Sequence, residues 1–126
     1  MIDTSVEPEV FSWGSTDVLV GANLLEQLAD ITTARLAPFG VVGVFCGCGS
    51  MRAQGTLQRL EDVLGSVASL ELFEGIESNP TLELADEGAA FLQKVRPDLL
   101  IAIGGGSVID LAKVSNCAAQ ADLPAA

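Results

Sequence analysis

A run of three glycines and a serine between two apolar segments constrains this chain more than any other feature. Leu99 to Ile103 is uninterruptedly apolar and has strand character, and Gly104–Ser107 follows it directly. Apolar residues then return at Ile109 and Ala112, with Val108 as a further candidate, at the spacing of a helix face. The order predicts a strand, a tight turn and a helix.

A turn of this kind favours the binding of an anion. Glycine lets the backbone turn with positive φ and lets a ligand approach closely, while the first N–H groups of a helix point into the same space. The helix dipole adds to this, so a phosphate or pyrophosphate is the expected guest. Ser107 and Asp110 also fit a capping box, so each has a structural explanation beside a ligand-binding one. As a short dinucleotide fingerprint the run is incomplete, because Ile109 stands where glycine or alanine is required.

As a longer string, Gly104–Lys113 reads Gly-Gly-Gly-Ser-x-x-Asp-x-Ala-Lys and resembles the signature of the iron-containing (group III) alcohol dehydrogenases. Phe73–Thr81 resembles that family's Gly-Val-x-x-Asn-Pro-Thr segment, and Gly88–Phe91 resembles the helix that follows it. Val18–Leu28 is similar to the family's opening strand and helix. The resemblance extends over Val18–Asn116, the first part of a family member.

The resemblance implies a cofactor site at the glycine run. The amides of Gly104, Gly105, Gly106 and Ser107 would cradle the pyrophosphate of NAD or NADP. Asp110 and Lys113 are weaker candidates on the nicotinamide side, since capping and a solvent-facing lysine explain them equally well. None of these residues is expected to be catalytic.

A second glycine-serine turn begins at Gly47 and would face the adenosine side of the cofactor, with Gly47 and Ser50 as candidate contacts. Many family members carry an aspartate near here that holds the adenine ribose, and this chain has none between Val41 and Gln58. Ser50 or Arg52 could contact a ribose or its 2′-phosphate, although an arginine at a helix start can also be simply solvated. The choice between NAD and NADP therefore stays open.

The remaining pattern alternates strands with helices. Strands are expected over residues 17–21, 41–46, 70–73 and 99–103, and helices from Asn23, after Gly55, from Asn79-Pro80 and from Ser107 to about Ala119. Asn79-Pro80-Thr81 is explained by helix initiation, with Asn79 as cap and Pro80 as first residue, or by a substrate role. Residues 1–12 suggest an arm or edge segment.

This alternation predicts one Rossmann-like α/β domain over residues 1–126, a parallel sheet with helices on both faces. Ligand sites should lie at the carboxyl ends of the strands, near residues 47–52 and 104–110.

The amino-acid composition limits the kinds of partner that this chain is expected to bind. Seventeen acidic and six basic residues give a formal charge of −11, which argues against nucleic acid and anionic membranes. The absence of a long apolar run or a leader pattern predicts a cytoplasmic protein without a membrane span. A hydrophobic content of 49% and a mean hydropathy of +0.45 suggest that another segment or chain covers part of its surface. Cys46, Cys48 and Cys117 are expected to be free thiols, because their number is odd and no export signal is seen. A metal site at these cysteines is not expected, because histidine is absent and the ligands are too few.

The missing histidines shape the functional prediction. In the family that this chain resembles, a helical second domain supplies one aspartate and three histidines to Fe²⁺ or Zn²⁺, which polarises the alcohol oxygen. We therefore predict the NAD(P)-binding portion of a metal-dependent alcohol dehydrogenase, inactive alone, as a fragment or as one half of a split enzyme. Its partners would be a complementing metal-domain chain or further copies of itself. The alternatives are a non-catalytic nucleotide-binding or protein-interaction module and a product that does not fold alone.

Overall fold

The computed structural model describes residues 9–14, 16–20, 24–28, 30, 40–47, 55–65, 67–77 and 79–122. Its elements are, in chain order, β1 (Glu9–Trp13), β2 (Thr16–Val20), η1 (Leu24–Gln27), β3 (Gly40–Gly47), α3 (Thr56–Leu64), β4 (Ala68–Ile76), α4 (Leu82–Val95), β5 (Leu99–Ile103) and α5 (Gly106–Asp122). No described helix is long and apolar enough to cross a membrane.

A three-stranded parallel sheet with the order β4-β3-β5 is the centre of the molecule. The middle strand is buried from Val42 to Cys46, as its nearly continuous apolar sequence predicts for a strand covered on both faces. Its partners are in register over most of their length, with Val44 opposite both Leu72 and Ile101. The predicted α/β class with a parallel sheet is confirmed.

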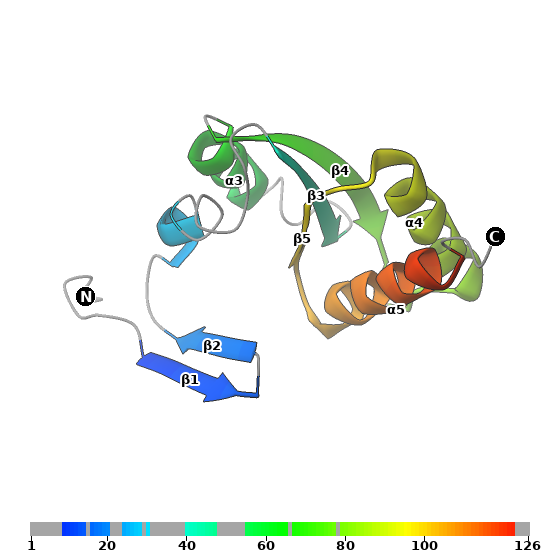
Figure 1. Cartoon of the computed structure of the whole chain (residues 1–126), viewed down its shortest axis with the longest axis horizontal. Helices are drawn as coiled ribbons and strands as arrows, with labels where there is room; N and C mark the ends of the chain where they lie inside the picture. The colour runs from blue at the N-terminus through cyan, green and yellow to red at the C-terminus, as the bar shows by residue number, and fades with distance from the viewer. Residues whose placement is uncertain are drawn as a thin grey trace.

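Helices cover both faces of this sheet (Figure 1). On one face α4 and α5 pack side by side against Phe45. On the other face α3 packs its buried leucines against Val42 and Val44. The buried residues of α3 are Leu57, Leu60 and Leu64, which lie on one side of the helix.

The contact between α4 and α5 is unusually close at one point. The hydroxyl of Ser115, whose side chain is fully buried, donates a hydrogen bond to the backbone carbonyl of Ala85 at 3.0 Å. A Cβ added at Gly88 would overlap Oγ of Ser115 and lie 3.1 Å from Cε2 of Phe45. The absence of a side chain at Gly88 therefore lets the two helices approach each other.

Asp98 fixes the start of β5. Its N–H donates to the carbonyl oxygen of Val41 at 2.8 Å, and its Oδ2 accepts from the Val41 N–H at 2.8 Å. Next to it, the ring of Pro97 lies against Gly43, where an added Cβ would meet Cγ at 3.1 Å. These contacts hold the amino end of β5 against β3.

The structure corrects the predicted start of α4. Thr81, not Asn79, is the N-cap: its side-chain oxygen accepts a hydrogen bond from the Leu84 N–H at 3.2 Å, and Pro80 precedes the cap. A hydroxyl in this position satisfies an N–H of the first turn. The cap explains Thr81 without a substrate.

The amino-terminal strands also depart from the simplest prediction. β2 was expected to belong to the alternating parallel pattern, but it pairs antiparallel with β1 in a separate two-stranded sheet. A turn as short as the one between β1 and β2 can only join antiparallel strands. The expected edge segment is thus strand β1 for residues 9–12. The predicted helix from Asn23 is described only as the short η1 and at residues 28 and 30.

Candidate functional site

The glycine run lies where β5 ends and α5 begins. Gly104 has a φ of +150°, and the N–H groups of Val108 and Ile109 donate to the carbonyl of Gly105 at 3.1 and 3.3 Å. The helix therefore starts at Gly106, and Ser107 is its second residue. The prediction that Ser107 is the N-cap is wrong, because the first helical carbonyl belongs to Gly105.

The three glycines are not equivalent. A Cβ at Gly104 would lie 2.8 Å from Cγ2 and 3.1 Å from Cβ of Val108. Gly104 is therefore required by the fold for two reasons: Val108 occupies the space of a side chain, and the positive φ disfavours other residues. Among the residues that the structure describes, a Cβ at Gly105 or Gly106 would meet nothing within 4 Å, and neither residue has a positive φ. Within that part of the chain, the backbone at Gly105 and Gly106 borders open space. The N–H groups of a first helical turn lack intrahelical acceptors and can bind an anion there.

The sheet topology places this loop at a switch point. The chain leaves β3 toward β4 at one edge and returns past β3 to β5 at the other edge. In sheets of this kind, ligands bind in the crevice between the carboxyl ends of strands that diverge in this way. Those ends are Gly47 and Ile103, and a Cβ at Gly47 would lie 3.6 Å from Cγ2 of Val108.

The structure thus brings Gly47 close to the glycine run, through Val108. The cofactor contacts predicted for Gly47 and for the glycine run stay predictions. Ser50 and Arg52 lie outside the described residues, so their predicted cofactor contacts stay predictions.

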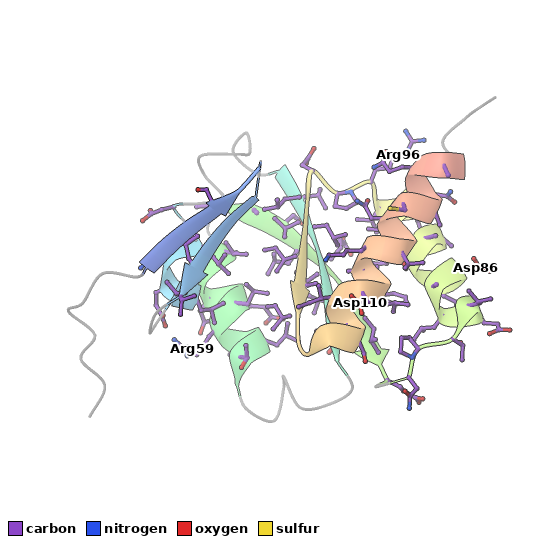
Figure 2. The ribbon with its side chains drawn as sticks, turned by 90° about the horizontal axis from the view of Figure 1, so that it is seen from below. Arg59, Asp86, Arg96 and Asp110 are labelled. Atoms are coloured by element: carbon purple, nitrogen blue, oxygen red, sulfur yellow. The ribbon has the colours of Figure 1, made fainter. Side chains whose placement is uncertain are left out.

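Asp110 and Lys113 project from the exposed side of α5. Figure 2 shows Asp110 near the loop end of α5 and Arg96 near the other end of that helix. Lys113 lines a shallow groove of about 250 Å³ beside β5, together with residues Leu100, Ala102, Ile109, Ala112 and Asn116. Asp110 is within one helical turn of the loop, whereas Lys113 is one turn further along α5 and faces the β5 side.

Two contributors were not assigned to the site from the sequence, although Val108 was considered for the apolar face of the helix. Val108 fills the space between the first loop glycine and Gly47, and Asp98 fixes the strand that carries the loop. Val108 is 5% exposed, and its place directly after the glycine-serine turn was the available signal. For Asp98 the signal was an acidic residue directly before an apolar strand.

Two other hollows lie away from the loop. The larger, about 390 Å³, is lined by residues near the amino end of β5 and the carboxyl end of α4, including Arg96 and Asp98. The smaller, about 230 Å³, is bordered by Glu77, Glu83 and Glu87 beside the cap of α4. Within the described ranges no group of three or more metal-ligating side chains occurs.

The sequence matches the family model of iron-containing alcohol dehydrogenase over residues 15–125. The probable NADH-dependent butanol dehydrogenase 1 of Bacillus subtilis (strain 168) is 30% identical over 112 residues, which cover 87% of this chain and 28% of that protein. The NADPH-dependent butanol dehydrogenase of Clostridium saccharobutylicum is 33% identical over 98 residues, which cover 77% of this chain and 24% of that protein. The chain therefore spans about a quarter of the length of these relatives.

Solved structures agree. The iron-containing alcohol dehydrogenase of Thermococcus thioreducens superposes with a TM-score of 0.70 and 29% identity, over 81% of this chain and 26% of that one. The aligned part is the amino-terminal α/β region. From its sequence match and from this superposition, the chain belongs to the iron-containing alcohol dehydrogenase family.

Proposed function

We propose that this chain is the NAD(P)-binding portion of a metal-dependent alcohol dehydrogenase, which transfers hydride between an alcohol or aldehyde and a nicotinamide cofactor. The observation that carries the proposal is the open space at Gly105 and Gly106, next to Gly47 and at the amino end of a helix of 17 residues. A pyrophosphate can approach a backbone without side chains and accept hydrogen bonds from its N–H groups.

The residues present fit a dinucleotide through backbone groups. Gly104 makes the turn, Gly105 and Gly106 expose the backbone, and Ser107 adds a hydroxyl in the first turn. At a net charge of −11 the protein repels an anionic ligand at long range, so the local amides and the helix dipole must supply the attraction. Asp110 and Lys113 would contact the nicotinamide half, and Gly47 with Ser50 the adenosine half.

A bound nicotinamide cofactor would accept or donate the hydride, and the metal would polarise the substrate oxygen. The chain contains no histidine. We therefore assign Fe²⁺ or Zn²⁺ to a separate, complementing segment or chain, and we assign no catalytic residue here. The curated relatives include one named for NADH and one named for NADPH, so both cofactors are candidates.

Calorimetric titration of the purified chain with NADH and NADPH tests this function. Gly105→Asp would put side-chain bulk and a negative charge against the pyrophosphate and should abolish saturable binding. Ala90→Asp adds the same charge at an exposed position of α4 and should bind as the unmodified chain does. Equal affinity in all three proteins, or no binding by the folded unmodified chain, would contradict the proposal.

The second candidate is a binding module without chemistry. It is favoured by the hydrophobic content of 49% and the mean hydropathy of +0.45, which suggest that another chain covers part of the surface. A neighbouring reading frame that encodes an aspartate followed by three spaced histidines would favour the split enzyme, whereas its absence would favour the module.

A further inference from the structure

The carboxyl ends of β3 and β5 lie next to each other at the candidate site. Cys46 and Ile103 are register partners in the parallel pairing, so the residues that follow them, Gly47 and Gly104, stand at the same level of the sheet. The two parts of the proposed cofactor site, with adenosine at Gly47 and pyrophosphate at the glycine run, are therefore neighbours.

One side chain of α5 lies between these two strand ends. The three atoms nearest to a Cβ built at Gly104 all belong to Val108, at 2.8, 3.1 and 3.6 Å. The nearest of them, Cγ2, also lies 3.6 Å from a Cβ built at Gly47. A single methyl group therefore fills the space between the two glycines.

Val108 is held firmly in this position. It is buried in the core cluster that contains Phe45 and Ile76, and its N–H donates to the carbonyl oxygen of Gly105 at 3.1 Å. A β-branched side chain in a helix strongly prefers one χ1 rotamer. Both the backbone and the side chain of Val108 are thus fixed relative to the loop, as a rigid spacer requires.

The spacing matters because adenosine and pyrophosphate are joined covalently in NAD(P). The two parts of the site must lie at the separation that this one molecule spans, and hydrogen-bond donors displaced by a fraction of an ångström bind it less well. Removal of buried methyl groups leaves a cavity that the surroundings fill only in part. An added methylene group at such a place forces backbone shifts.

We propose that Val108 is a positioning residue for the cofactor: its Cγ2 methyl group sets the separation between the glycine run and the end of β3, and thereby the fit of one dinucleotide across both. Val108 acts through the backbone at Gly104 and Gly47. The inference rests on the proposed function, since it requires that the cofactor binds at this place.

Calorimetric titration with NADH and NADPH, together with urea denaturation of each protein, tests the proposal. Val108→Ala should raise the Kd of the preferred cofactor about tenfold, because the loop loses its spacer. Val108→Ile should raise the Kd as well, since the extra methylene group presses the loop away from Gly47. Val108→Thr keeps the branched shape and should bind within about twofold of the unmodified chain, although its buried hydroxyl lowers the free energy of unfolding.

Leu111→Val is the matched control for stability. Leu111 belongs to the same core cluster, one helical turn further along α5, but none of its atoms is among those nearest to a Cβ at Gly104 or Gly47. This variant should lower the free energy of unfolding and leave the Kd unchanged.

The outcomes separate this inference from the proposed function. If the unmodified chain binds the cofactor and Gly105→Asp does not, an unchanged Kd for Val108→Ala and Val108→Ile would overturn the inference alone. A Kd that follows the loss of stability through all variants would also overturn it, because Val108 would then act only as a core residue. No binding by the folded unmodified chain would overturn the inference and the proposed function together. If Val108→Ala does not fold, the comparison of Val108→Ile with Val108→Thr decides in the same way.

Discussion

Two glycine-containing regions of this chain are under opposite constraints. Where α4 meets α5, Gly88 has no room for a side chain, because Ser115 and Phe45 occupy the space. At the end of β5, the described residues leave space for a side chain at Gly105 and at Gly106, yet both positions are glycine. A glycine that its neighbours require is explained by the fold, whereas a glycine beside open space calls for a ligand.

The largest effect on folding is expected at the crowded contact. Gly88→Ala should lower the free energy of unfolding by about 2 kcal/mol, because overpacking and disturbance of the Ser115 hydrogen bond exceed the gain in helix propensity. Urea denaturation measures the change. Combining it with Ser115→Gly should recover part of the loss, since the overlapping side chain is then gone. If Gly88→Ala instead stabilises the chain, as propensity alone would, the contact is looser than the structure indicates.

A somewhat smaller loss is expected at the first loop glycine. Gly104→Ala should cost about 1–2 kcal/mol, because alanine is strained at a φ of +150° and its Cβ would press on Val108. Thermal denaturation of this variant and of Gly104→Ala with Val108→Ala separates the two causes. Val108→Ala removes the side-chain atoms that the new Cβ would meet, but it leaves the backbone strain at position 104. Unchanged stability of the single variant would show that the loop can rearrange freely.

The smallest effect, and one of opposite sign, is expected at the last loop glycine. Gly106→Ala should stabilise the chain by about 0.5 kcal/mol, because the site has space for a Cβ and alanine restricts the unfolded chain. Urea denaturation of Gly106→Ala and of the unmodified chain measures this difference in the free energy of unfolding. Destabilisation would mean that the fold itself requires this glycine and would remove the contrast with Gly104.

The sequence predicts the parallel sheet and the loop well because both depend on local patterns. The apolar runs of β3 and β5 and the glycines that follow β5 indicate strands and a turn without knowledge of the partners. The predicted caps of α4 and α5 were each misplaced by two residues, because Asn79 and Ser107 are as suitable chemically as Thr81 and Gly105, which hold those positions.

Contacts between distant residues could not be predicted in this way. That Gly88 faces Ser115, and that Gly104 is tight while Gly105 is open, depends on how α5 packs against the sheet. The pairing of β1 with β2 was missed for a related reason: a weakly patterned edge segment gives little local signal. The candidate site was therefore predicted as a set of residues, and the structure distinguishes their roles.

We propose that a ligand, and not the fold, requires glycine at positions 105 and 106. The most direct measurement is the calorimetric Kd of NADH and NADPH for the double variant Gly105→Ala with Gly106→Ala, compared with the unmodified chain. We predict that the double variant folds and is at least as stable as the unmodified chain, and that it binds the preferred cofactor at least tenfold more weakly, a loss of about 1.4 kcal/mol in binding free energy. Equal Kd values for the two proteins would contradict it.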